Sequence, residues 1–463
     1  MSSGPGQPRG RHCPAQSLLI SLAGRMREPC RHSPPSMLAG LCPRTAEPGF
    51  PMVNVASNPA ASNGARSAST SGDLSVVDVP SVFSETASGG VRTYLTAKAR
   101  AYDRPGIRHT IVVPGEKTGF EEWEGGTLAR IGSPVFPLAP AYRQLVDWRA
   151  LRDVFEIVNP SVIEVGGPFS EPILVRLALS GRRVPVVGFY HADLVRTFAE
   201  PFVDHAVLSP LRAILRMGAR RMIRAVYNRF DATVCASSSM FRELRALGVK
   251  NVHEVPLGVD LETFRPLDRE DESDTRPLPA RNGAPIAVYV GRICPEKRLD
   301  VLLDGHAMLP REEQPNLFLV GDGNIRDSMA ARARDGGRVT LLPYVSDREE
   351  LVRVYNAADY YVAPGPGETF GLSIGEAMAC GLPVLCVGRG AGPDRVEGSG
   401  ASELYRHGDP ADVARGIRAM RRHLGQDARE RARAHAERTL DWAVTFDRLL
   451  ALYDQLASAG GTS

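Results

Sequence analysis

The sequence of 463 residues contains no apolar run that approaches the ~18–20 residues needed to cross a bilayer. None of its seven cysteines form a C-x2-C pair and their number is odd, so the pattern favours neither a zinc site nor a disulfide framework. This cysteine usage fits a reducing, cytoplasmic compartment. A net charge of only +3 gives no indication of a nucleic-acid partner.

The composition is that of a folded soluble protein. Hydrophobic residues make up 43% of the chain and charged residues 24%, which excludes a mainly disordered protein. The chain is longer than the size at which one hydrophobic core usually stops growing. We therefore expect two domains with appendages.

Residues 1–72 differ from the rest of the chain. They hold seven arginines, two acids, no lysine and ten of the 36 prolines, and we predict a disordered leader. The one apolar patch, Ser17–Gly24, follows Arg9 and Arg11 as in a signal peptide, but it is short and no clear cleavage pattern follows it. We favour an unstructured leader, or an upstream translation start with the working start near Met52.

The remaining chain alternates apolar, β-branched segments with stretches of helical periodicity. Such alternation predicts α/β domains with parallel sheets covered on both faces. We expect a first domain at 73–265, a charged, Pro-rich linker at 266–284, a second domain at 285–436, a C-terminal helix at 437–458 and a tail at 459–463. The expected strands are Leu74–Val79, His109–Val113, Val162–Val165, Val184–Phe189, Ala232–Ala236, Ile286–Val290, Leu317–Val320, Val339–Leu342, Tyr360–Ala363 and Pro383–Val387.

The most informative stretch is Tyr361–Leu385, YVAPGPGETFGLSIGEAMACGLPVL. A strand ends at Ala363, a Pro/Gly loop presents Glu368, and a helix that opens near Phe370 or Gly371 carries Glu376. Free N–H groups at a helix start bind anions, and two carboxylates beside them suit sugar hydroxyls. Singly, each glutamate is more often a helix-stabilising or solvated acid.

Other candidate residues also follow strand ends, where open α/β sheets bind their ligands. Arg292 and Lys297 come after a strand and a glycine, although such cations alone are more often solvated. Gly89 and Gly90 allow close approach of a ligand to a helix N-terminus, although most Gly-Gly pairs only make turns. His191 follows another strand, a position that is more often structural.

The E-x7-E spacing in this setting resembles the donor-site signature of the large family of retaining glycosyltransferases of family 4, or group 1, type. Members have the fold called GT-B, two Rossmann-like doubly wound domains that face each other across a cleft. The segment VGRICPEK, Val290–Lys297, resembles the family's element for the donor diphosphate. The segment VPLGVDLETF, Val255–Phe264, resembles the segment before its interdomain linker. The resemblance covers about 74–458.

This resemblance implies a role for each candidate. Glu376 would hold the ribose hydroxyls and Glu368 the hydroxyls of the donor sugar. Arg292 and Lys297 would neutralise the diphosphate, and His191 would lie near the donor sugar. The other donor-binding positions are Gly89, Gly90, Phe370, Gly371 and Leu372. Leu257 stands where the family often has asparagine, and the loop 364–367 is stiffer than usual, so the sugar cannot be read from the motif.

The function implied is transfer of a hexose from GDP-mannose or a UDP-hexose to a lipid or glycan acceptor, with retention at the anomeric carbon. No carboxylate is placed as a covalent nucleophile, so we favour same-face attack assisted by the leaving phosphate. No D-x-D motif sits at a strand end, and we expect neither a metal nor a cofactor other than the donor. The alternatives are a GT-B epimerase or phosphorylase, and a catalytically silent binding protein of this fold.

A basic segment at Ser209–Phe230 contains six arginines and no acid. Its arginine stripe recurs every four residues and consists of Arg212, Arg216, Arg220 and Arg224. The expected apolar side consists of Leu211, Ile214, Leu215, Met222 and Val226. A basic amphipathic helix is typical of proteins that bind an anionic membrane surface, here the inner face. The alternative is a core-facing helix with solvated arginines and a polysaccharide or small-molecule acceptor.

Overall fold

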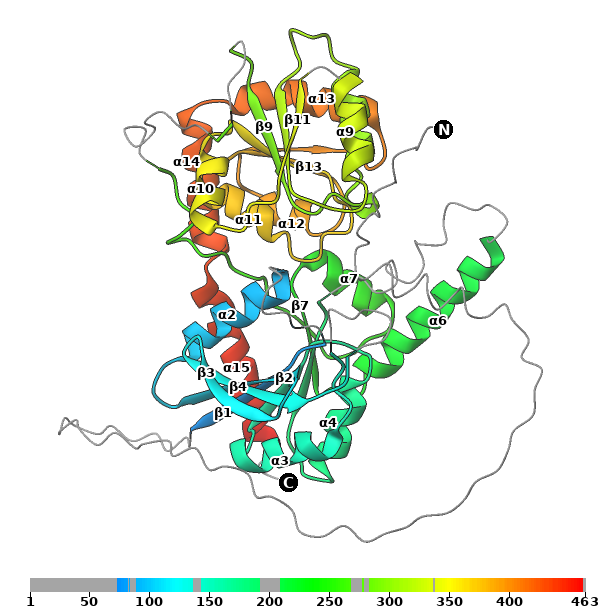
Figure 1. Ribbon diagram of the computed structural model, residues 1–463, viewed down its shortest axis with the longest axis vertical. Helices are drawn as coiled ribbons and strands as arrows, with labels where there is room; N and C mark the ends of the chain where they lie inside the picture. The colour runs from blue at the N-terminus through cyan, green and yellow to red at the C-terminus, as the bar shows by residue number, and fades with distance from the viewer. Residues whose placement is uncertain are drawn as a thin grey trace, which may run out of the picture.

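The structure is a computed structural model that describes residues 73–81, 83, 89–135, 143–191, 209–267, 277–278, 283–335 and 338–460. The expected leader and most of the expected linker lie outside the described residues. The described part contains two sheets, one above the other in Figure 1.

The first sheet has eight strands in the order β3-β4-β2-β1-β5-β6-β7-β8. Only β3 and β4 pair antiparallel; the other neighbours are parallel. The strands are β1 (Leu74–Val79), β2 (Ile107–Gly115), β3 (Gly119–Trp123), β4 (Gly126–Gly132), β5 (Val162–Val165), β6 (Val186–Phe189), β7 (Ala232–Cys235) and β8 (Val252–Glu254). The helices are α2 (Gly90–Tyr102), α3 (Trp148–Val158), α4 (Glu171–Leu179), α6 (Ser209–Tyr227) and α7 (Ser238–Ala246).

The second sheet has six strands, all parallel, in the order β11-β10-β9-β12-β13-β14. The strands are β9 (Ile286–Val290), β10 (Asn316–Val320), β11 (Val339–Leu342), β12 (Tyr360–Ala363), β13 (Val384–Val387) and β14 (Ser402–Tyr405). The helices are α8 (Leu299–Ala307), α9 (Arg326–Asp335), α10 (Arg348–Asn356), α11 (Leu372–Ala379), α12 (Gly392–Val396), α13 (Pro410–Met420), α14 (Gln426–Thr439) and α15 (Trp442–Gly460), with short 3-10 turns η5 (Pro295–Lys297) and η6 (Arg421–His423).

Each sheet separates two hydrophobic cores. Along β1, Val77 and Val79 point into one core and Val76 into the other. Along β9, Val288 and Ala287 likewise belong to opposite cores. Successive strand residues face opposite sides, so a strand buried on both faces must be apolar throughout. The expected α/β class is confirmed.

The chain returns from the second sheet to the first at its C-terminal end. The sequence predicts the last helix at 437–458, but α14 ends at Thr439 and α15 begins at Trp442. In Figure 1, α14 lies beside the second sheet and α15 runs beside the first. At the crossing, the Val259 N–H donates to the Leu440 carbonyl at 2.8 Å. Gly258 is required there because a Cβ would lie 2.3 Å from the Trp442 nitrogen.

A buried ionic cluster joins α15 to the first sheet. Lys98 Nζ lies 2.7 Å from Asp78 Oδ1 and 3.3 Å from Glu164 Oε2, and all three side chains are at most 2% exposed. The Tyr453 hydroxyl of α15 accepts from Lys98 at 3.0 Å and donates to Glu164. Buried charges need such partners, so the cluster attaches the last helix to the core.

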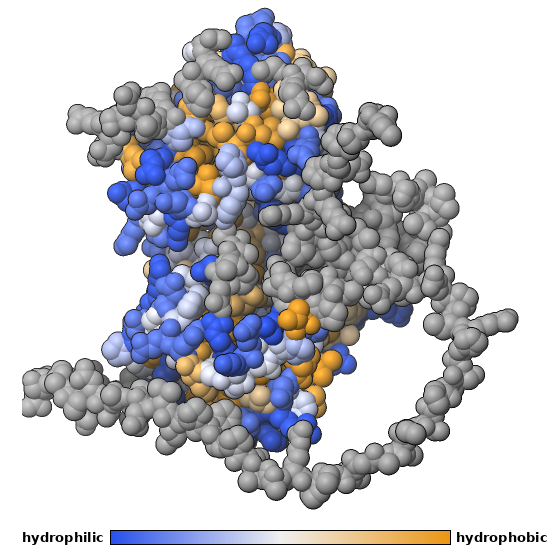
Figure 2. Space-filling view, in the orientation of Figure 1, coloured by the Kyte–Doolittle hydropathy of each residue, from blue (hydrophilic) through white to orange (hydrophobic). Residues whose placement is uncertain are grey.

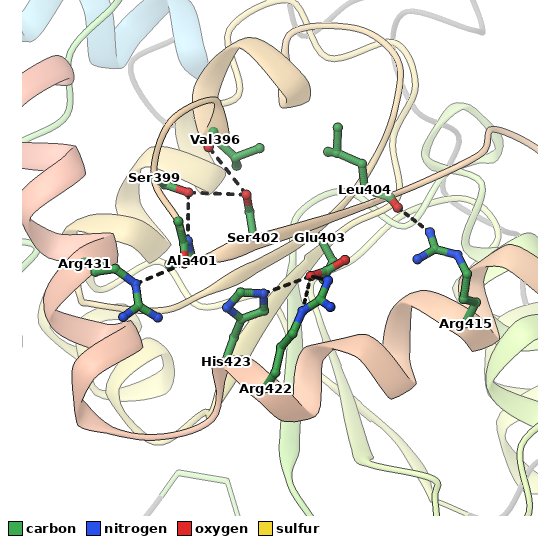
Figure 3. Close-up of polar contacts among 11 residues, drawn as sticks. Val396, Ser399, Ala401, Ser402, Glu403, Leu404, Arg415, Arg422, His423 and Arg431 are labelled. Carbon is green, nitrogen blue, oxygen red and sulfur yellow. Dashed lines mark hydrogen bonds and ion pairs between the residues drawn. The ribbon is translucent and has the colours of Figure 1, made fainter.

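The edge strand β14 is held by charged side chains (Figure 3). Glu403 accepts from Arg422 Nε and from His423 Nε2, both at 2.9 Å. Arg415 donates to the Leu404 carbonyl at 2.7 Å. These contacts attach β14 to α13 and η6, and charged side chains at a sheet edge also discourage pairing with another chain.

Candidate active site

The N-terminus of α2, beside the first sheet, lies close to the N-terminus of α11, beside the second sheet. Gly90 is the first residue of α2, and Gly371 precedes α11 with a φ of 63° that favours glycine. A Cβ on Gly90 would lie 3.4 Å from side-chain atoms of both Phe370 and Leu372. Figure 1 shows α2 and α11 on facing sides of the boundary between the two halves. The N–H groups of both helix starts lack intrahelical partners, which favours an anion.

Glycines shape the loops that follow β9 and β10. Gly291 and Gly321 have φ values of 154° and 149°. A Cβ on Gly321 would lie 1.9 Å from the Gly291 carbonyl oxygen, so no side chain fits. The first of these loops leads to the 3-10 turn that ends at Lys297.

Lys297, in the turn after β9, and Glu368, in the loop after β12, form an ion pair. Lys297 is 16% exposed and Glu368 23%. Burial by itself would lower the pKa of Lys297, but the Glu368 carboxylate outweighs it and the pKa lies above its usual value. Lys297 therefore remains charged in a partly desolvated position.

Arg292 lies in a more open position than Lys297. Its guanidinium pairs with Glu296 four positions along the chain, and its side chain is 57% exposed. The Arg292 carbonyl accepts from the Tyr289 hydroxyl at 2.7 Å, which fixes the loop backbone. An exposed ion pair of this kind contributes little to stability.

Glu376 sits in the second turn of α11, partly buried. Its Oε2 accepts a hydrogen bond from the Tyr355 hydroxyl of α10 at 3.1 Å. Burial raises the pKa of Glu376, and the Tyr355 hydroxyl and Arg348 offset part of that rise. Tyr355 thus orients the carboxylate that the motif places here.

His191 is packed among aromatic rings where β6 ends. It stacks on Phe189 at 4.2 Å between centroids and meets Tyr94 and Phe370 edge to face at 5.7 and 5.8 Å. Burial lowers its pKa to about 3, so the imidazole is neutral at physiological pH. The Thr369 hydroxyl donates to the His191 carbonyl at 3.2 Å, which joins the loop of Glu368 to the first sheet.

The segment 388–396, which includes α12, bridges the two sheets. Arg395 donates to the carbonyls of Phe370 at 2.6 Å and Leu257 at 2.7 Å. Asp394 accepts from the Ser239 N–H at the start of α7, at 2.8 Å. The contacts with Leu257 and Ser239 join positions more than a hundred residues apart, so they leave no local signal in the sequence.

The sequence matches two protein-family models, "Glycosyltransferase Family 4" over residues 88–263 and "Glycosyl transferases group 1" over residues 284–423. It is 30% identical over 356 residues to the GDP-mannose-dependent alpha-(1-6)-phosphatidylinositol dimannoside mannosyltransferase of Mycobacterium tuberculosis, covering 74% of this chain and 88% of that protein. The chain belongs to the family 4, group 1 glycosyltransferases. Glycosyl transfer is therefore its activity, and the predicted membership of this family is confirmed.

Other relatives agree with this assignment. The glycosyltransferase is 36% identical over 286 residues to the D-inositol 3-phosphate glycosyltransferase of Mycolicibacterium smegmatis, covering 59% of this chain and 63% of that one. Its fold is similar to that of the sucrose-phosphate synthase of Thermosynechococcus elongatus, with a TM-score of 0.68, 20% identity, and coverage of 83% of this chain and 100% of that one. The predicted GT-B fold is confirmed.

Proposed function

We propose that this glycosyltransferase transfers a hexose from a nucleoside diphosphate sugar bound where α2 and α11 begin. The observation that carries the proposal is the meeting of two helix starts beside the Lys297–Glu368 pair. Backbone N–H groups and a charged lysine suit a diphosphate, and a neighbouring carboxylate suits sugar hydroxyls.

Each charged group then has a role in the reaction. The leaving nucleoside diphosphate gains negative charge as the glycosidic bond breaks. Lys297, Arg292 and the helix starts would stabilise that charge more in the transition state than in the ground state. Glu376 would bind the ribose hydroxyls and Glu368 the sugar hydroxyls, with neutral His191 beside the sugar.

GDP-mannose is the donor that we propose first. The relative that matches over 88% of its length is named for GDP-mannose and for a phosphatidylinositol dimannoside acceptor. A UDP-hexose is the second candidate. A screen of donors by released nucleoside diphosphate, followed by mass spectrometry of the product, decides between them. Product formation from neither donor would overturn the proposal.

We propose further that the sugar is transferred with retention and without a metal ion. Lys297 and Arg292 supply the positive charge that a divalent cation would otherwise bring to the diphosphate. Activity should therefore survive excess EDTA, and the product's anomeric proton should show the donor's configuration by NMR. Complete loss that Mg²⁺ restores, or an inverted product, would contradict these assignments.

The acceptor that we propose is lipid-linked and is reached at an anionic membrane surface. Arg216, Arg220 and Arg224 of α6 are exposed, whereas the helix packs on the body through Ala219, Ile223 and Tyr227. Ile214, which belongs to the predicted apolar side, is 60% exposed. The side chains of Leu211 and Arg212 lie outside the described residues. Figure 1 shows α6 extending away from the first sheet.

Exposed apolar residues on α4 and α6 add to this surface. Ile173 and Leu177 lie four residues apart on α4, and Ile214 and Met217 lie on α6. Buried residues of both helices belong to one core cluster. Figure 2 shows hydrophobic surface over the region of α4. Within the described ranges no helix has the length and apolar character to cross a membrane.

Co-sedimentation with vesicles tests the membrane proposal. Wild type should bind vesicles that contain anionic phosphatidylglycerol, and salt should weaken the binding. Changing Arg216, Arg220 and Arg224 to Gln should lower the affinity roughly 100-fold, since each contributes about 1 kcal/mol. A matched control changes Arg311, Arg406 and Arg421 of the second half and should bind as wild type. Equal binding by both triple variants would refute the role of α6.

A further inference from the structure

Buried polar atoms without hydrogen-bond partners gather where β1, β5 and β6 end. Ser81 Oγ, Ser170 Oγ, Glu171 Oε2 and His191 Nδ1 are all buried and unpartnered in the part of the chain that the structure describes. Each of these groups costs free energy when it is buried without a partner. Their concentration at the carboxyl ends of neighbouring strands points to a ligand, because open α/β sheets bind their ligands there.

The turn after β5 brings these groups together. A Cβ on Gly167 would lie 2.0 Å from Ser81 Oγ, and one on Gly166 would lie 3.4 Å from His191 Cδ2. The two glycines therefore let Ser81 and His191 approach the strand end closely. Glu171 begins α4, and the hydroxyls of Ser81 and Ser170 lie beside its carboxylate without forming a hydrogen bond of normal geometry.

Glu171 differs from the structural acids of this fold. Its side chain is buried, with 6% of the residue exposed, and no lysine or arginine pairs with it among the described residues. Burial raises the pKa of Glu171, and the neighbouring N–H and hydroxyl groups offset only part of that rise. By contrast, buried Glu164 has Lys98 as a partner, and Asp147 at the start of α3 accepts from the N–H groups of Arg149 and Ala150.

We propose that Glu171, Ser81 and Ser170 form an acceptor subsite that binds hydroxyl groups of a sugar or polyol ring next to His191. A carboxylate accepts hydrogen bonds from neighbouring hydroxyls, and serine hydroxyls both donate and accept. His191 contacts Phe370 of the donor side and lies beside Gly166 of this subsite. The subsite rests on the proposed function, because it gives the sugar donor an acceptor.

The position of α4 connects this subsite to the proposed membrane surface. The helix begins at Glu171 and carries exposed Ile173 and Leu177. A polar head group bound at Glu171 would thus have apolar surface next to it for a lipid tail. The hydroxyl groups that Glu171 would bind are the same in a free sugar and in a lipid-linked sugar.

Steady-state kinetics of Glu171→Gln test the proposal, with GDP-mannose as donor. The two probe acceptors are phosphatidylinositol dimannoside in vesicles and water-soluble methyl α-mannoside. In the variant, KM should be roughly 10- to 100-fold higher for each acceptor that wild type uses, because one charge-assisted hydrogen bond to the acceptor is lost. GDP affinity should stay within about twofold, since the proposal places Glu171 on the acceptor side. Ser81→Ala should raise the same KM by a smaller factor.

Asp147→Asn is the matched control for an acid at a helix start. It should lower the melting temperature without changing the acceptor KM. If Glu171→Gln behaves in the same way, Glu171 is only structural and the proposal is overturned. If wild type glycosylates both probe acceptors, the subsite recognises the sugar itself. If wild type glycosylates only the acceptor in vesicles, the acceptor is lipid-linked. If wild type glycosylates neither probe acceptor, the proposed acceptor class is refuted. If wild type does not bind GDP, the proposed donor function is refuted instead.

Discussion

Lys297 and Glu368, 71 positions apart in the sequence, form an ion pair between the loops that follow β9 and β12. These two strands are neighbours in the second sheet, so their carboxyl ends deliver both side chains to one edge. A donor diphosphate would draw the Lys297 ammonium away from Glu368. The carboxylate would then be available to the hydroxyls of the donor sugar.

Lys297→Met should lower kcat/KM for the donor roughly 10- to 100-fold, because a charge-assisted contact to the diphosphate is lost. Lys297→Arg should recover part of the loss, since it keeps the charge. Steady-state kinetics with the preferred donor measure both. Unchanged kcat/KM in Lys297→Met would remove Lys297 from the site.

Glu376→Ala should weaken nucleotide binding roughly 10- to 100-fold, because the ribose loses a carboxylate acceptor. Tyr355→Phe should weaken it by a smaller factor, since it removes only the hydroxyl that orients Glu376. Calorimetric titration of GDP into each variant and the double variant gives the coupling. Additive effects would show that Tyr355 does not act through Glu376.

The buried His191 should make stability depend on pH. Its folded-state pKa of about 3 lies below its ordinary value of 6.5, so the unfolded chain binds more protons between these two pH values. The free energy of unfolding therefore falls as pH drops below about 6.5, by up to about 1.4 kcal/mol per unit from this group. Urea unfolding at pH 7.5 and 5.5 should show a smaller drop for His191→Asn. Equal drops would contradict a neutral, buried His191.

Lys98→Met should destabilise the protein by about 3–5 kcal/mol, because it leaves Asp78 and Glu164 buried without their cation. Tyr453→Phe should cost about 1.5–3 kcal/mol through the lost contacts of its hydroxyl. Tyr360→Phe is the control, since the buried Tyr360 hydroxyl has no hydrogen-bond partner among the described residues. Denaturant unfolding measures all three. If Tyr453→Phe matched the control, α15 would not be held by this cluster.

Sequence reasoning found the strands that are apolar throughout, because burial on both faces leaves a local pattern. It missed four strands, β3, β4, β8 and β14. None of the β3 residues GFEEW is buried, and the β14 residues SELY include two polar ones. The last helix was predicted to start at residue 437, whereas α15 begins at Trp442, since both α14 and α15 have helical periodicity. Contacts that depend on the tertiary fold, such as those of Tyr453, leave no local signal.

The candidate site was predictable where a motif follows a strand. Glu368, Glu376 and Lys297 could be named from strand ends and from the family resemblance. Thr369 and Arg395 could not, because their partners His191 and Leu257 lie 178 and 138 positions away. Glu171 was missed because an acid at a helix start is typical of dipole stabilisation, and only its burial without a lysine or arginine partner among the described residues distinguishes it.

In the proposed reaction, Glu368 and its surroundings bind and activate a sugar nucleotide. The most direct measurement follows GDP release and mannosylated product together, with GDP-mannose and phosphatidylinositol dimannoside vesicles, for wild type and Glu368→Ala. Wild type should form GDP and product in equal amounts. Glu368→Ala should bind GDP normally and turn over roughly 10- to 100-fold more slowly. Wild-type turnover in the variant, or GDP release without any glycosylated product in wild type, would contradict the account.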